Sequence, residues 1–446
     1  MLQIKDIFLT PIYIIIIYVI AMYFRPKVTT PVTIRYYMPA LYLKLAGSIA
    51  LGLLYTFYYE GGDTGNYFYH IKIVNDAFWT SPAAGLELIF SHGQYSPNLA
   101  TWVNKMWWYH APAEFMVIRI GSILSLVSFC TYLVIAMLFA LLSFSGMWAM
   151  FRTFLKLYPH LHRQFAIALF YMPSVFFWGS GLMKDSLCLG GLGWLLYALY
   201  QALIERKNFI QSGLIIVGVT YVILIMKAYI ILAFMPPALF WIINEFGRRI
   251  QNRVARQLLT PVFVAVGLAA AVFGLTRVTA GNTQFDLDRV AERAKITSDY
   301  IYRVSLEQGG AAYTLGEVDG TISGMLRLAP QAINVTLFRP YIWEVRNFIM
   351  FFSSMESAVF LFLTLTLIWR TGFFKTIRLI VSVPILQLCF TFALLFSMSV
   401  GLSTNNFGTL ARYKVQMMPF YLSGLYIANH LSAESRRQRR LAFARA

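Results

Sequence analysis

The chain has 446 residues, of which 59% are hydrophobic and only 13% are charged. This composition excludes an ordinary soluble globular protein and predicts an all-α, polytopic membrane protein with one integral membrane domain over residues 1–446. The net charge of +18 does not indicate nucleic-acid binding, because basic residues in membrane proteins set the topology and attract anionic membrane lipids.

Apolar runs about as long as a membrane-crossing helix recur along the chain. The first run lacks a small-residue cleavage site and precedes Arg25 and Lys27, so we expect a membrane helix and not a signal peptide. The third run is too long for one upright helix, and part of it should tilt or lie along the interface. Eleven helices are predicted, at 7–24, 39–59, 120–150, 165–183, 187–204, 210–226, 229–246, 261–276, 358–369, 379–398 and 415–430.

Basic residues mark alternate loops, as they do on the cytoplasmic side of membrane proteins. All these loops fall on one face if the N-terminus is outside and the C-terminus is cytoplasmic, with 431–446 as a basic cytoplasmic tail. Two long polar segments, 60–119 and 277–356, then lie outside. The first contains the aromatic residues Trp102, Trp107, Trp108 and Tyr109, typical of interfacial helices. The second alternates acids and bases and predicts a helical subdomain.

The three cysteines lie in apolar runs without a partner at metal or disulfide spacing, so they are expected to be packing residues. No metal and no cofactor is predicted. The sequence contains neither a Rossmann-like stretch nor a phosphate-binding loop of the P-loop kind, which argues against a soluble nucleotide-sugar donor.

The glycine-rich stretch 60–70 follows the apolar run 43–59 and contains one carboxylate among glycines and aromatic rings, that of Asp63. A general base needs such a carboxylate to take a proton from a hydroxyl nucleophile. Nearby rings, Tyr67 among them, could hold a sugar. The alternative is that the stretch merely caps the end of a helix, since glycine and Asp favour caps and turns.

Three further places set ionisable residues against apolar runs, where each needs a partner, a cavity or a function. Lys184 and Asp185 follow Ser180 and Gly181 and precede Ser186, a composition that suits an anion pocket at a helix N-terminus; the alternative is a local Lys184–Asp185 pair. Lys227, with Tyr229 beside it, separates two apolar runs, and its alternative role is snorkelling to the interface. Arg412 and Lys414 stand at the external end of the last run, where the positive-inside rule disfavours them.

The segment 337–347 adds Arg339 and Glu344, which could instead form a solvated salt bridge. Cations recognise phosphate through charge-assisted hydrogen bonds. One carboxylate base, several external cations and many aromatic rings therefore predict an external, lipid-linked phosphate as the ligand.

The first loop with Asp63, the small-residue hairpin ending in Lys184, the Lys227-Ala-Tyr229 turn, and Arg412-Tyr413 before Pro419 resemble GT-C-type glycosyltransferases and the related O-antigen and exopolysaccharide polymerases. The resemblance implies a polyprenyl-phosphate- or pyrophosphate-linked sugar donor, a glycan or lipid acceptor, and transfer on the periplasmic side of a bacterial inner membrane. It implies Asp63 as the base, and Lys184, Lys227 and Arg412 around the phosphate. The chain departs from the family in having a single Asp in this loop, and Lys184 where many polymerases have Arg.

The predicted chemistry is displacement at the anomeric carbon, with Asp185 and then Glu344 as the next candidates for the base. Two other functions stay open. A lipid-linked oligosaccharide flippase would show broken helices or charges at mid-membrane depth, and internal repeats. A non-catalytic subunit of a polysaccharide assembly machine would need none of these features.

Overall fold

The structure is a computed structural model that describes residues 1–91, 93, 96–249, 290–307, 310–316 and 320–443. It is 84% helical, and no strand forms among these residues, which confirms the all-α class. Seven of the described helices are long and apolar enough to cross a membrane, in agreement with an integral membrane protein. They are α1 (Ile4–Val28), α2 (Ile34–Phe57), α7 (Tyr132–Leu157), α10 with η4 (Lys184–Ile204), α11 (Phe209–Arg249), α15 (Phe348–Thr371) and α17 (Pro384–Ser403).

The chain divides into two compact units. The first unit comprises Met1–Leu199 and Asn208–Lys227, and the second comprises Tyr200–Lys207 and Ala228–Ala446. Each unit is described by itself below.

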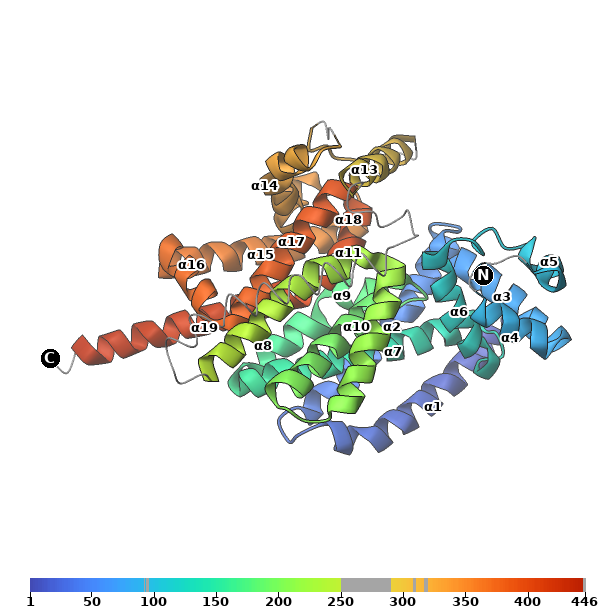
Figure 1. The fold of residues 1–446 in the computed structure, drawn as a ribbon, viewed down its shortest axis with the longest axis horizontal. Coiled ribbons are helices and arrows are strands. Elements are labelled where there is room, and N and C mark those ends of the chain that lie inside the picture. Colours follow the sequence, from blue (N-terminus) through green and yellow to red (C-terminus); the bar gives the residue numbers. More distant parts are fainter. Residues whose placement is uncertain (92, 94–95, 250–289, 308–309, 317–319, 444–446) are drawn as a thin grey trace. The chain divides into compact units, whose positions relative to one another are not determined.

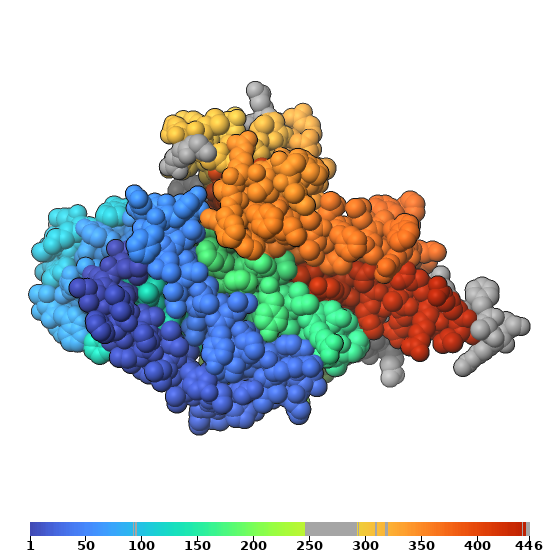
Figure 2. Space-filling model, turned by 180° about the vertical axis from the view of Figure 1, so that it is seen from behind, coloured from blue at the N-terminus to red at the C-terminus, as the bar shows by residue number. Residues whose placement is uncertain are grey.

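In the first unit, α7 is the buried centre and packs against α2 and α10. Glycines bring two of these helices into backbone contact: a Cβ atom on Gly146 of α7 would lie 1.8 Å from the carbonyl oxygen of Gly190 in α10. Small residues allow such close approach of membrane helices, where packing and not hydrophobicity drives association. Helix α1 is mostly exposed and lies along the outside of the unit, dark blue in Figures 1 and 2.

The polar segment 60–119 also belongs to the first unit and is largely helical. Helix α3 packs against α4 and α6. Ser81 caps α4 by accepting a hydrogen bond from the amide of Ala84, and a proline starts α6 at its first position, where no amide donor is needed. The elements are α3 (Asp63–Thr80), α4 (Pro82–Phe90), η1 (Pro97–Leu99), α5 (Ala100–Val103) and α6 (Pro112–Val127).

The second unit packs α14 against α17 and places α19 beside α15 and α17. A Cβ atom on Gly401 of α17 would lie 2.4 Å from the carbonyl oxygen of Ala332 in α14, so this crossing also depends on a glycine. The described helices here, besides α15 and α17, are α13 (Val290–Glu307), α14 (Ile322–Phe338), η7 (Ile342–Glu344), α16 (Phe373–Ser382), α18 (Phe407–Tyr413), η8 (Lys414–Gln416) and α19 (Met418–Phe443).

Several predicted spans differ from the observed helices. The run 120–150 is two helices, because the backbone turns at Phe129 and Cys130, which both have positive φ. The run 165–183 is not one helix: it comprises α8 (His162–Ala166), the π-helical η3 (Ile167–Tyr171) and α9 (Pro173–Trp178), interrupted before a proline that has no amide to donate. The run 379–398 likewise breaks before Pro384.

The runs 210–226 and 229–246 are parts of one long helix, α11, which is interrupted only by the non-helical backbone of Lys227 (φ −151°, ψ 71°). The run 415–430 corresponds to η8 and α19, and α19 is not among the seven candidate spans. The run 261–276 lies outside the described residues. The count of eleven helices therefore stays a prediction.

Candidate functional site

Asp63 is the first residue of α3, not part of the end of α2, which has its cap at Tyr58. The glycine stretch does cap α2, since the amide of Gly61 donates to the carbonyl oxygen of Tyr55 at 3.1 Å. Asp63 itself belongs to the next helix, α3. Gly61 and Gly62 make the turn with φ of 152° and 108°, a backbone that residues with a Cβ rarely adopt. The half-buried Asp63 side chain stands at a helix N-terminus, where the helix dipole favours a negative charge.

Tyr67, one turn further along α3, is buried, with its ring centroid 5.0 Å from that of Trp108. Its face is covered by protein, so it is not available at the surface for a sugar. The exposed ring at this end of α3 is that of Tyr69, which sequence reasoning did not single out.

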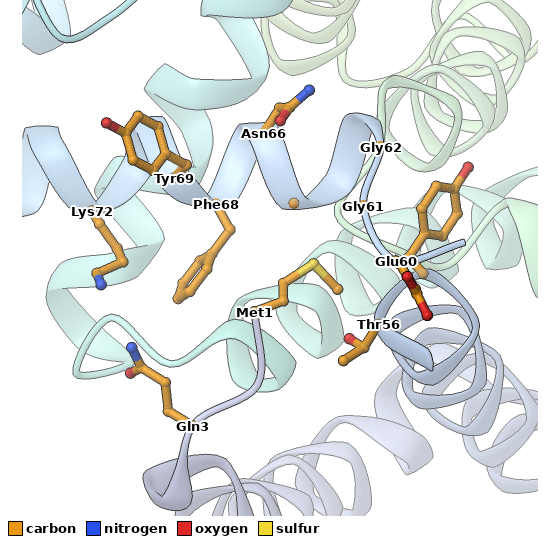
Figure 3. A pocket seen from close by; sticks show the side chains of 12 residues that line it. Met1, Gln3, Thr56, Glu60, Gly61, Gly62, Asn66, Phe68, Tyr69 and Lys72 are labelled. Atoms are coloured by element: carbon orange, nitrogen blue, oxygen red, sulfur yellow. The ribbon is translucent and has the colours of Figure 1, made fainter. Parts of the chain in front are cut away.

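A cavity of about 380 Å³ opens beside the glycine turn, between the end of α2, one face of α3 and the N-terminal segment. Gly62 and Gly65, on either side of Asp63 in the chain, both line it. Figure 3 shows Phe68 and Lys72 pointing from α3 toward Met1 and Gln3. The other lining residues are Tyr55, Thr56, Glu60, Gly61, Asn66 and Tyr69.

Lys184 and Asp185 begin α10 but form ion pairs with different helices. The Lys184 ammonium lies 2.5 Å from a carboxylate oxygen of Glu114 in α6, and an Asp185 carboxylate oxygen lies 2.5 Å from the ammonium of Lys227 in α11. These two tertiary pairs take the place of the expected local pair. Sequence reasoning missed Glu114, which is the one carboxylate in the first turn of α6.

The anion pocket expected at the start of α10 has its hydroxyl groups already engaged. Ser180 donates to the carbonyl oxygen of Phe176, and Ser186 donates to that of Gly181 at 2.7 Å. These bonds close the hairpin between α9 and α10. Any anion bound there would depend on Lys184 and on backbone amides.

Lys227 is buried, and its bond to Asp185 contradicts the alternative that it snorkels to the membrane interface. The bond forms where α11 loses helical geometry. A non-helical residue leaves nearby backbone groups without their helical hydrogen bonds. The helix break and the buried ion pair therefore occur at the same residue, Lys227.

Lys44 is a second buried lysine, and sequence reasoning missed it. Its ammonium donates to the carbonyl oxygens of Gly179 at 2.7 Å and Val175 at 3.3 Å, and to the hydroxyl of Ser143 at 3.1 Å. The two carbonyls belong to the last turn of α9 and to the residue after it, so Lys44 caps that helix and holds the hairpin that carries Lys184. Lys44 is the only charged residue in the run 39–59, which was a readable signal.

A smaller cavity of about 150 Å³ lies in the same unit, lined by Gly93, Tyr109, His110, Pro112, Phe115, Arg119, Tyr221 and Ile225. Arg119 donates to the carbonyl oxygens of Ile89 and Ser91 at the end of α4. Its guanidinium therefore caps a helix, which leaves the cavity with tyrosine and histidine as its polar groups.

In the second unit, Arg339 and Glu344 form the salt bridge that the sequence left as an alternative. The Arg339 Nε lies 3.0 Å from both carboxylate oxygens, and the amide of Tyr341 donates to one of them at 2.8 Å. Burial raises the pKa of Glu344, but these hydrogen bonds outweigh it and hold that pKa below its ordinary value.

The remaining predicted residues also lie in the second unit and contact protein groups. The fully buried Lys414 donates to the hydroxyl of Ser357 at 2.9 Å. The Arg412 guanidinium lies 5.8 Å from the ring centroid of Tyr413, and Tyr229 stacks on Phe396 at 5.7 Å. Lys184 and Lys227 belong to the first unit and Arg412 to the second, so a single anion site containing all three stays a prediction.

The described residues include no group of three or more His, Cys, Asp or Glu side chains that could hold a metal ion. The three cysteines are free and buried. Comparisons with protein-family models, with curated proteins and with solved structures find no match. The site must therefore be judged on its own geometry.

Proposed function

We propose that this chain is a membrane glycosyltransferase or polysaccharide polymerase of the GT-C-like kind. It transfers a sugar from a polyprenyl-phosphate- or pyrophosphate-linked donor to a glycan or lipid acceptor. The observation that carries the proposal is the placement of Asp63: a half-buried carboxylate at the start of α3, directly after a glycine turn and next to residues that line an open cavity. A base in this position can meet a hydroxyl group that enters the cavity.

In the proposed reaction, Asp63 takes the proton of the acceptor hydroxyl as its oxygen forms a bond to the anomeric carbon. The bond from that carbon to the phosphate oxygen breaks, and the phosphate leaves with the electron pair. Lys184 suits the leaving phosphate best in the first unit, because its partner Glu114 is partly exposed and can be exchanged for a phosphate. Lys227 is less accessible, since Asp185 holds it in the interior.

The proposal includes the predicted topology, with the N-terminus outside, the C-terminus cytoplasmic and transfer at the external face of a bacterial inner membrane. It rests on the alternation of basic loops along the sequence. Cysteine-accessibility labelling tests it: a cysteine introduced near Gly310 should react from outside, and one in the tail near Arg437 should react only after permeabilisation.

Replacement of Asp63 by Asn tests the enzymatic proposal. Asp63→Asn keeps the shape of the side chain but cannot take a proton, so transfer from a lipid-linked donor should fall by about a hundredfold or more. Asp76→Asn is the matched control, since Asp76 is an exposed carboxylate on the same helix. Normal transfer by Asp63→Asn would defeat the proposed base.

A second candidate is a lipid-linked oligosaccharide transporter, and one feature of the structure favours it. The long apolar helix α11 is broken at a buried lysine that pairs with Asp185, and broken helices with buried charges are typical of transporters. The two functions separate in vesicles: a transporter moves a fluorescent lipid-linked saccharide between leaflets without an acceptor and keeps this activity in Asp63→Asn.

A further inference from the structure

The side chains that line the cavity beside the glycine turn are in part polar, and their charges balance. Its lining side chains include one carboxylate, Glu60, and one ammonium, Lys72, together with the amides of Gln3 and Asn66. A phosphate site needs an excess of positive charge or a cluster of amide donors. The helix N-terminus at this cavity already has the carboxylate of Asp63, which disfavours a second anion there. A site that offers both hydrogen-bond donors and hydrogen-bond acceptors, with aromatic residues beside them, suits an uncharged ligand rich in hydroxyl groups.

Two aromatic rings extend this site along the surface. Tyr69, which lines the cavity, stacks on Trp107 with ring centroids 5.1 Å apart and planes 21° from parallel. Tyr69 is 46% exposed and Trp107 is 58% exposed, so both rings are accessible to a ligand. Aromatic rings offer a large rigid apolar face, which can stack on the CH face of a sugar ring.

The imidazole of His70 packs against both rings and provides an independent observation. Its ring centroid is 4.3 Å from that of Trp107. The side chain is fully buried, yet neither ring nitrogen has a hydrogen-bond partner within the part of the chain that the structure describes. Burial lowers the pKa of His70 to about 4, so the neutral ring has one donor and one acceptor. Buried polar groups without partners are costly, so an unpartnered imidazole at this place calls for an explanation such as a functional role or a bound water.

We propose that the cavity and the Tyr69–Trp107 ring pair form the binding site for the acceptor saccharide. One uncharged sugar occupies the cavity with its nucleophilic hydroxyl toward Asp63, and the next sugar stacks on the ring pair. This inference rests on the proposed function, and it assigns the acceptor to the α3 side of the first unit. The donor phosphate is expected elsewhere, because the side chains that line this cavity have no excess positive charge and Asp63 stands beside it.

The rival explanation is that Tyr69 and Trp107 only anchor the protein at the membrane interface, as exposed aromatic residues often do. The chain supplies a matched control in Trp79, which is on the same helix, is 71% exposed and does not line the cavity. Interfacial anchoring should depend on Trp79 as much as on Trp107. Saccharide binding should depend on Trp107 alone.

The test measures binding of the full chain in nanodiscs to an array of neutral, amino and acidic di- to tetrasaccharides. It uses the Asp63→Asn background without any lipid-linked donor, so that no transfer occurs. The ring variants Tyr69→Ala and Trp107→Ala should each weaken retention of neutral saccharides by about tenfold, and Lys72→Met should weaken it further through the lost hydrogen bond. Trp79→Ala should bind as the background protein does. Thermal unfolding of each variant shows that it remains folded.

Absence of saccharide binding, or equal loss in Trp79→Ala and Trp107→Ala, would overturn the inference, as would a preference for acidic saccharides that Lys72→Met does not change. Failure of the enzymatic proposal gives a different result. A chain that binds neutral saccharides through these rings, but transfers sugar normally with Asp63→Asn, retains the acceptor site and loses the proposed base.

Discussion

The ion pairs Asp185–Lys227 in the first unit and Arg339–Glu344 in the second differ in burial and in how far apart the partners lie in the chain. In the first unit, Lys184 pairs with a residue 70 positions away and Asp185 with one 42 positions away. In the second unit, the Arg339–Glu344 pair joins residues only five positions apart and is partly exposed. The first arrangement depends on helix packing and the second on one short turn, so loss of a partner should cost far more at the buried Asp185–Lys227 pair than at Arg339–Glu344.

The largest expected effect is at the Asp185–Lys227 pair. Lys227→Met removes the lysine from a fully buried carboxylate, which typically costs about 3 to 5 kcal/mol. Denaturant unfolding in detergent, followed by tryptophan fluorescence, should show a lower midpoint. The double variant Lys227→Met/Asp185→Leu should regain most of the loss, because apolar residues can replace a buried ion pair. A stable single variant would show that the pair does not hold α11 to α10.

Lys44→Met should have a smaller effect, because Lys44 is bonded to carbonyl and hydroxyl groups. Leaving buried acceptors without a donor costs about 1 to 3 kcal/mol. The backbone amides of the hairpin 179–186 should exchange hydrogen faster in this variant. The ion pair between Lys184 and Glu114 should also weaken, because the hairpin positions Lys184. Lys105→Met, at an exposed lysine, is the control. Unchanged exchange in the hairpin would mean that Lys44 does not position it.

The smallest effect is expected at the local pair of the second unit. Glu344→Gln should cost less than about 1 kcal/mol near neutral pH, as partly exposed salt bridges do, and Glu307→Gln, at an exposed glutamate, should cost less still. Because the pKa of Glu344 is lowered in the folded protein, its contribution is complete above the ordinary carboxyl pKa and disappears as the pH falls through the lower folded value.

Melting temperatures measured from pH 7 down to pH 3 test whether the contribution of Glu344 to stability falls with pH. The difference between the wild-type protein and Glu344→Gln should shrink as the pH falls. A difference that grows in acid would contradict the direction of the shift.

Apolar runs predicted most of the membrane helices, but not where they break. Hydropathy alone joined 165–183 into one span, whereas Pro173 and the tight hairpin before Lys184 divide it. It also separated 210–226 from 229–246, which are one helix with a break at Lys227. Local backbone chemistry and side-chain pairing decide such breaks, and a hydropathy window averages over both.

The sequence by itself determined the membrane class, the all-α fold and the positions where charge meets an apolar run, because burial of charge in lipid is costly wherever it occurs. It could not determine the partners. Glu114 with Lys184, Asp185 with Lys227, and Lys44 with the end of α9 are each brought together by helix packing between segments far apart in the chain. Only the tertiary structure decides such contacts, because any buried charge could have been satisfied by any group of opposite polarity.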